Sequence, residues 1–253
     1  MPGMTALGAS SAPVSAVRSR RLSLTSILVP AATAVTILAL ALLPLLTPWF
    51  VHPALAAADS PAWLGASQGL VNDFSDQTVH DLVFGGGFRI APRPEPCACV
   101  SLPPPAFPTG ASLYTDAEIA HMRDARTLLY AFLGLAVLSV ATLAISITRA
   151  PDRAVVWRSI ATGARGLAIA VVVGGVIGFF AFEPAFELFH RIFFPGGNWA
   201  FDPATSELVR LYPYLFWQIA AGSLGAIAVG LAALTWWFSR RRALAAADVR
   251  VTR

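Results

Sequence analysis

Two histidines, His121 and His190, occur in the two most polar stretches that border the long apolar segments of this chain. A histidine ring titrates near neutral pH and can therefore take up or release a proton during a reaction. Asp124 follows His121 at a spacing that places both on one helix face, and Glu183 and Glu187 form one stripe with His190. Ionisable groups beside an apolar segment are costly unless they are paired or hydrated, so both stretches are candidates for a functional site.

The same stretches also have structural interpretations, and on the residues alone both remain open. Arg191 is spaced to form a surface ion pair with a glutamate one turn earlier, which contributes little to stability. Trp199 and its aromatic neighbours suit the belt of rings that membrane proteins carry at the lipid–water interface. Asp202 and Pro203 have the pattern of an N-cap and a first helical residue, which predicts a short helix reaching about Tyr212.

Other candidate sites have weaker support. Ser67 lies in a Gly-x-Ser-x-Gly motif, which forms a nucleophile elbow only between a strand and a helix, and the proline-rich loop here cannot supply that setting. Cys97 and Cys99 form a single Cys-x-Cys pair, and no second pair exists to complete a zinc site. A metal site built from two histidines and Asp202 is a minor alternative. The sequence therefore predicts no metal and no cofactor.

Composition and the distribution of apolar residues indicate a membrane protein. Of the 253 residues, 56% are hydrophobic and only 13% are charged, whereas soluble domains average about 25% charged residues. The apolar residues occur in four blocks, each near the roughly 20 residues that a helix needs to cross a bilayer. The sequence therefore predicts an all-α polytopic membrane protein with four transmembrane helices.

The arginines set the expected orientation in the membrane. Of the 18 basic residues, all arginine, 12 lie in the two terminal segments and the middle loop, and six in the two remaining connections. Because cytoplasmic segments are enriched in arginine, both termini are expected in the cytoplasm, and loops 52–127 and 188–213 outside it. The net charge of +4 follows this topology rather than one face, so nucleic acid is not an expected partner.

The chain divides accordingly into tails, spans and loops. The first span is expected to be a retained anchor, although its basic flank and an Ala-Leu-Ala run also fit a cleaved signal peptide. A capping-box pattern from Thr115 to Glu118 marks the helix start that leads into the second span, and Leu64 to Phe84 suits a short helix. The expected segments are a disordered cytoplasmic tail (1–26), span one (27–51), an extracytoplasmic loop with a membrane-proximal helix start (52–127), span two (128–148), a cytoplasmic loop (149–166), span three (167–187), an extracytoplasmic re-entry loop with the site motif (188–213), span four (214–238) and a cytoplasmic tail (239–253).

Two sequence signatures stand out in the polar stretches. Residues 118–124 have the pattern Glu-x-x-His-Met-x-Asp, and residues 189–203 contain Phe-His-x-x-Phe-Phe, Gly-Asn-Trp and Phe-Asp-Pro in that order. A continuation, Leu-Val-Arg-Leu-Tyr-Pro, occupies residues 208–213, and Ser206 stands before it where the pattern favours an acidic residue. These signatures resemble those of a family of bacterial integral membrane proteins that includes the lipoprotein intramolecular transacylases, the Lit-like family.

The resemblance implies acyl transfer at the outer leaflet of the membrane. One fatty acyl chain would move from the diacylglyceryl group of a lipoprotein to the α-amine of that lipoprotein's N-terminal cysteine. The substrate supplies the attacking amine, so no protein nucleophile is needed. His121 and His190 are implied as base and acid, and their assignment stays open. The supporting residues implied, as orienters of an imidazole or donors to the oxyanion, are Asp124, Glu187, Arg191, Asn198, Trp199 and Asp202.

The expected partners are diacylglyceryl-modified lipoproteins and membrane phospholipids, and the expected location is the bacterial cytoplasmic membrane as a multi-pass protein. The alternative is a non-catalytic integral membrane protein whose extracytoplasmic loop binds a partner. The two readings differ in whether His121 and His190 converge, because a catalytic site needs both rings within reach of one substrate molecule.

Overall fold

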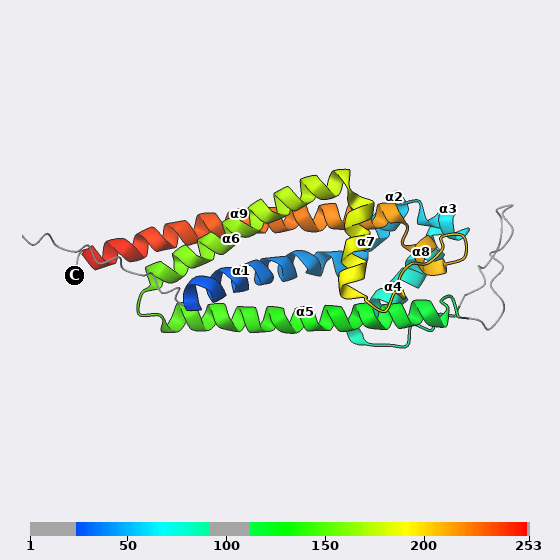
Figure 1. The fold of residues 1–253 in the computed structure, drawn as a ribbon, viewed down its shortest axis with the longest axis horizontal. Coiled ribbons are helices and arrows are strands. Elements are labelled where there is room, and N and C mark those ends of the chain that lie inside the picture. The colour runs from blue at the N-terminus through cyan, green and yellow to red at the C-terminus, as the bar shows by residue number, and fades with distance from the viewer. Residues whose placement is uncertain (1–23, 92–111, 252–253) are drawn as a thin grey trace, which may run out of the picture.

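The computed structural model describes residues 24–91 and 112–251 of the chain, and these residues form helices and their connections. The long helices make up the body, and shorter helices gather at one end of it (Figure 1). The long helices are α1 (Leu24–Leu42), α5 (Asp116–Arg149), α6 (Arg153–Phe180) and α9 (Tyr214–Val251). The shorter ones are the 3₁₀ turn η1 (Leu43–Leu46), α2 (Pro48–Ala57), α3 (Ser60–Leu64), α4 (Gln68–Phe84), α7 (Phe182–Phe193) and α8 (Glu207–Leu211).

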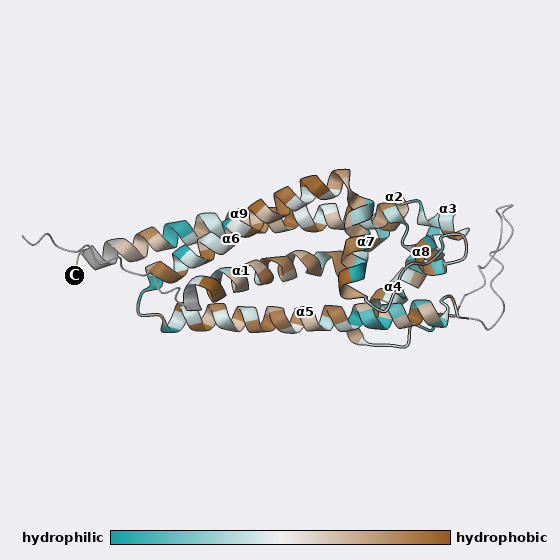
Figure 2. Ribbon diagram, viewed as in Figure 1, coloured by the Kyte–Doolittle hydropathy of each residue, from teal (hydrophilic) through white to brown (hydrophobic). Residues whose placement is uncertain are grey.

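Four helical segments are long and apolar enough to cross a membrane. They are Ser26–Leu46, Asp116–Arg149, Arg153–Phe180 and Tyr214–Ala247. Figure 2 shows apolar residues along the middle of the long helices, and polar residues near α4, α8 and the start of α5 and again at the opposite end of the long helices. The expected all-α membrane fold with four spans is confirmed, and the orientation of the termini stays a prediction.

Helix α5 connects the polar end of the molecule to the membrane without a break. It begins with a capping box, in which the Thr115 hydroxyl oxygen accepts from the Glu118 backbone N–H, and the Glu118 carboxylate accepts from the Thr115 backbone N–H. The predicted helix start is therefore confirmed. Because the helix continues to Arg149, the turns that carry His121 are rigidly joined to the apolar span.

The third long helix ends earlier than the expected span 167–187. Helix α6 stops at Phe180, Ala181 departs from helical geometry with φ −137° and ψ 44°, and α7 begins at Phe182. Pro184 explains the break, because a continuous helix would bring its ring against the carbonyl of Phe180 and would lose one hydrogen bond. As a result, α7 runs across the end of the bundle toward α5 instead of prolonging α6 (Figure 1).

A compact apolar core stabilises the end of the molecule where the short helices gather. We call this part the head: α2, α3, α4, α8 and the first turns of α5. Leu55, Phe74, Phe88 and Leu211 lie in its core with at most 1% of their surface exposed. The helix expected between Leu64 and Phe84 is present as α4. The described part of segment 52–127 is therefore largely folded, and it supports the start of α5 and the chain around α8.

Helices α1 and α6 approach each other closely at Gly163. A Cβ atom added there would lie 2.5 Å from the carbonyl oxygen of Pro30 and 2.6 Å from its Cα. Backbone atoms cannot move aside as the end of a side chain can, so this crossing requires glycine. The contact fixes the position of α6 against α1, and with it the point from which α7 turns across the bundle.

Candidate active site

His121 and His190 meet where α7 reaches α5. His121 lies in the second turn of α5, and His190 lies in the last turn of α7. Their ring centroids are 5.8 Å apart and the ring planes differ by 28°. The two polar stretches that were singled out in the sequence therefore come together at a single place, and the turn at Ala181 is what brings the second one there.

Aromatic rings surround the two imidazoles. The Phe194 ring centroid lies 4.6 Å from that of His121 and 5.4 Å from that of His190. Phe201 approaches His121 at 5.8 Å, Trp199 approaches His190 at 5.1 Å, and Phe186 approaches His190 at 4.1 Å. These rings come from α7 and from the connection between α7 and α8. They give the imidazole pair surroundings of low polarity, in which charged groups are poorly solvated.

His190 is held in one tautomer by the backbone. Its Nδ1 lies 2.8 Å from the carbonyl oxygen of Phe186, which can only accept a hydrogen bond, so Nδ1 carries the hydrogen. In the neutral ring the lone pair is then on Nε2. The side chain is buried, and this burial lowers the pKa of the imidazole, against a smaller opposing effect of the Phe186 carbonyl. His190 is therefore suited to accept a proton at Nε2.

His121 and Asn198 each present a polar atom without a partner at this site. Nδ1 of His121 and Oδ1 of Asn198 are both buried, and neither has a hydrogen-bond partner among the described residues. The Asn198 amide nitrogen donates to Oδ2 of Asp124 at 2.8 Å. Asp124 is one helical turn from His121 on α5. Buried polar atoms in folded proteins nearly always have partners, so these two atoms are suited to contact a bound molecule.

The structure brings some of the expected supporting residues to the histidines and leaves others apart. Asp124, Asn198 and Trp199 lie at the site through the contacts described above. Glu187 and Arg191 instead pair with each other at 2.7 Å, and both side chains are exposed. Within the described residues, no hydrogen bond or ion pair joins either of them to His121 or His190.

Asp202 has a local role in the chain that leads to α8. Its carboxylate accepts a hydrogen bond from the Ala204 backbone N–H, and its carbonyl accepts from Thr205 and Ser206. The helix expected to start at Asp202 begins at Glu207 instead, because Ser206 is the residue that caps it. The Ser206 hydroxyl oxygen accepts from the Val209 backbone N–H.

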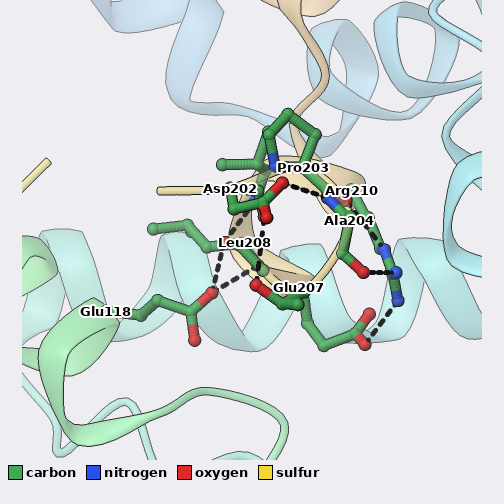
Figure 3. A network of polar contacts seen from close by, with 10 residues as sticks. Glu118, Asp202, Pro203, Ala204, Glu207, Leu208 and Arg210 are labelled. Carbon is green, nitrogen blue, oxygen red and sulfur yellow. Dashed lines mark hydrogen bonds and ion pairs between the residues drawn. The ribbon is translucent and has the colours of Figure 1, made fainter. Parts of the chain in front are cut away.

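Glu118, which the sequence predicts only as part of the capping box, has a buried carboxylate that connects α5 to α8 (Figure 3). One oxygen of Glu118 accepts from the backbone N–H and the hydroxyl of Thr115. The other oxygen accepts from the Ser206 hydroxyl and from the Leu208 backbone N–H, 3.0 Å away. Glu118 is only 1% exposed. It therefore holds the start of α5 against the end of the connection that carries Asn198 and Trp199.

The remaining candidates from the sequence do not join this site. Ser67 is the N-cap of α4 and accepts from the Leu70 backbone N–H, in a helix–turn–helix connection rather than a strand–turn–helix elbow. Cys97 and Cys99 lie outside the described residues. In the described part of the chain, no three His, Cys, Asp or Glu side chains are grouped so as to hold a metal ion.

The fold and the site together place this chain in the class of helical membrane proteins with four spans. Its site is a pair of imidazole rings, His121 and His190, where the spans meet the head. Residues 104–217, which include both histidines, match the family described as lipoprotein intramolecular transacylase Lit. A protein of Aquifex aeolicus (strain VF5) described as uncharacterized is 32% identical over 110 residues, 43% of this chain and 48% of that protein. The matched stretch thus spans about half the length of that curated relative.

Solved structures extend the likeness to the fold of nearly the whole chain. The in meso structure of the membrane integral lipoprotein intramolecular transacylase Lit from Bacillus cereus has a TM-score of 0.61 at 18% identity, covering 91% of this chain and 97% of that one. A structure of the same protein with a histidine-to-arginine mutation has a TM-score of 0.58 at 17% identity, covering 91% and 94%. The resemblance seen in the two signatures is therefore confirmed over residues 104–217, and the solved structures show that the fold of this chain is similar to that of the Bacillus cereus protein.

Proposed function

We propose that this chain is an acyltransferase of the bacterial cytoplasmic membrane that acts at the outer leaflet. It moves one fatty acyl chain from the diacylglyceryl group of a lipoprotein to the α-amine of the lipoprotein's N-terminal cysteine. The observation that carries the proposal is the 5.8 Å pairing of His121 and His190, each contributed by one of the two family signatures. A partner-binding loop without chemistry gives no reason for two imidazoles to face each other in apolar surroundings.

The chemistry needs one proton to be removed and one to be supplied. The amine nitrogen bonds to the ester carbonyl carbon, and the bond between that carbon and the glycerol oxygen breaks. The amine gives up a proton, and the glycerol oxygen gains one, so the reaction consumes no net proton. Because attacking amine and ester belong to one substrate molecule, holding them in register supplies much of the rate.

His190 is the residue best suited to take the proton from the amine. Its Nδ1–H is fixed on the Phe186 carbonyl, which leaves the Nε2 lone pair free and orients the ring. Its lowered pKa keeps the ring neutral near pH 7, the state that a base requires. His121 faces it and is assigned to donate a proton to the leaving glycerol oxygen. Transfer of the proton held by His190 to His121 then restores both neutral rings, so the cycle consumes no net proton.

The surroundings of the pair favour a lipid as the substrate. Helix α7 exposes large apolar side chains on the same helix that carries His190: Leu188 is 58% exposed and Ile192 is 60% exposed. Phe189 and Phe193 are also exposed. An amphipathic helix of this kind lies at a membrane surface with its apolar side among acyl chains. The acyl chain of a membrane-bound substrate could therefore reach the histidines without entering water.

Mass spectrometry of lipoprotein N-termini tests the proposed function. The chain is expressed in a bacterium whose lipoproteins carry the diacylglyceryl group and no N-acyl group. The expected product has an N-acyl cysteine and a glyceryl group with one remaining acyl chain, at unchanged total mass. Fragmentation assigns the acyl position. Unchanged N-termini, in cells that hold the inserted protein, would reject transacylation and favour the partner-binding alternative.

A further inference from the structure

The hydrogen bond between Asn198 and Asp124 fixes which end of the Asn198 amide is free. Asp124 is a carboxylate and only accepts hydrogen bonds, so the atom of Asn198 that lies 2.8 Å from its Oδ2 is the nitrogen. The amide cannot turn over without placing two oxygens against each other. The carbonyl oxygen, Oδ1, is therefore the end that is buried and lacks a partner among the described residues.

This geometry excludes one role for Asn198 and favours another. An oxyanion needs hydrogen-bond donors, whereas the free atom of Asn198 is an acceptor. Its amide nitrogen is already engaged with Asp124. A buried acceptor is complementary to a group with N–H or O–H bonds, and leaving it unpaired costs about 1–3 kcal/mol. A molecule that completes this site therefore presents a donor to Asn198.

We infer that Oδ1 of Asn198 receives an N–H of the substrate's α-amine, and that Asp124 positions Asn198 for this contact. The inference rests on the proposed function, in which the amine is the attacking group. A neutral amine has two N–H bonds: one donates to Asn198 and stays in place, while the other is the proton that passes to a histidine. Trp199, the next residue, packs on His190 at 5.1 Å, which keeps the Asn198 backbone close to the proposed base.

Binding of two lipopeptides that cannot react tests the contact directly. Both are dialkylglyceryl-cysteinyl peptides with ether bonds in place of the esters. One has a free α-amine, and the other has a hydrogen atom in place of the α-amine and so offers no N–H at that position. We expect the wild-type chain to bind the free-amine peptide more tightly. Asn198→Ala should weaken binding of that peptide roughly tenfold, the size expected for one hydrogen bond to a polar or charged group. It should leave binding of the peptide without the α-amine unaffected.

A purely structural role predicts a different result, since a displaced loop would weaken both peptides equally. Asn72→Ala is the matched control, because Asn72 is held by Gln68 on α4, away from the histidines. It should change neither affinity. Equal weakening of both peptides by Asn198→Ala, or a retained preference for the free amine, would overturn the inference.

An exchange of the two side chains separates an acceptor from a donor at position 198. In the double variant Asp124→Asn with Asn198→Asp, an amide at 124 donates to a carboxylate at 198, and the second carboxylate oxygen remains as an acceptor. We expect this variant to keep the preference for the free amine and to form lyso-form product, unlike Asn198→Ala. A donor role predicts that the exchange is inactive. A wild-type chain that binds neither peptide and forms no product would instead reject the proposed function together with this inference.

Discussion

Ser206 donates a hydrogen bond to Oε1 of Glu118, joining residues that lie 88 positions apart in the sequence. The carboxylate accepts three further hydrogen bonds, two from Thr115 and one from the Leu208 backbone. Glu118→Gln replaces one acceptor oxygen by an NH₂ group, which must then face either two donors of Thr115 or the donors of Ser206 and Leu208. We expect a loss of about 2 kcal/mol in stability, measured as a lower thermal midpoint in detergent.

Glu187→Gln is the matched control for this change. Glu187 pairs with Arg191 on the exposed side of α7. Exposed ion pairs contribute about 0–1 kcal/mol, so the thermal midpoint should hardly move. If both variants melt alike, the buried carboxylate does not hold α5 to α8.

The two halves of the Glu118 network show what could be predicted from the sequence. The Thr115 half depends on residues three positions apart, and the capping-box pattern identified it. The Ser206 half depends on where the chain returns after two spans, which no local pattern specifies. The sequence offered one hint, a serine where the family pattern favours an acidic residue. An acidic side chain there would lie against the Glu118 carboxylate and could donate to it only when protonated.

The histidine pair provides the central prediction. His121→Ala and His190→Ala should each abolish formation of lyso-form lipoprotein, while expression and membrane insertion stay normal. General acid–base groups contribute roughly 10²–10⁴-fold to rate. Because the two rings act as one unit, the double variant should be little worse than either single variant.

His80→Ala is a suitable control, since His80 is exposed on α4 and has no contact with the pair among the described residues. It should retain activity. A correctly inserted double variant of His121 and His190 that still forms N-acylated product would end the proposal that these rings catalyse the transfer.

The pKa of the His190 imidazole can be measured and compared with its ordinary value. Burial lowers the pKa of this imidazole below the ordinary value of 6.5. A chemical-shift titration of histidine-labelled protein, with His190→Gln used to assign the signal, should place its midpoint below that value. A midpoint at or above 6.5 would show that the ring is better solvated than its aromatic surroundings indicate.

The same shift predicts how stability depends on pH. Folded His190 binds its proton at lower pH than unfolded His190, so the unfolded chain gains the proton first as pH falls. The contribution of His190 to the free energy of unfolding is therefore constant well above pH 6.5. This contribution is lost as the pH falls from 6.5 through the pKa of His190 in the folded protein. His190→Gln should remove this part of the decline, seen as a smaller drop in thermal midpoint between pH 8 and pH 5. Equal drops in both proteins would contradict the linkage.

The orientation in the membrane is predicted from the arginines and can be measured with reporter fusions. Fusions after Arg21, near Arg158 and after Arg242 should report the cytoplasm, and one near Pro104 should report the outside. Arg21 and Pro104 lie outside the described residues, so this result depends on the charge distribution alone. A cytoplasmic signal near Pro104 would invert the topology and place the histidine pair at the inner leaflet.

The convergence of the histidines was predictable, whereas the detailed contacts of the site were not. Both histidines border apolar helices on the same predicted side of the membrane. The positions of the predicted spans therefore indicate that the two side chains lie at a similar depth in the membrane. That α7 turns across the bundle depends on Pro184, whose effect on the helix end the span pattern missed. The free oxygen of Asn198 could not be predicted, because it depends on a hydrogen bond between residues 74 positions apart.

Gly197 offers a test of how the backbone before Asn198 is set. Gly197 has φ +74°, and a Cβ atom there would meet no other atom within 4 Å. Gly197→Ala therefore introduces backbone strain without a clash, costing about 1 kcal/mol in the left-handed region. If the strain is relieved by a change of φ, the following residues, Asn198 and Trp199, are displaced from Asp124 and His190. We expect a slightly lower thermal midpoint and a clearly lower yield of lyso-form product.

Gly196 supplies the control from the adjacent position. It is equally open to an added Cβ, and its φ lies outside the positive region that disfavours other residues. Gly196→Ala should therefore leave both the thermal midpoint and product formation close to wild type. The difference between two neighbouring Gly→Ala changes then isolates the positive φ from any effect of added volume. If both variants keep wild-type activity, the left-handed turn is not what positions Asn198, and the hydrogen bond to Asp124 must hold that side chain alone.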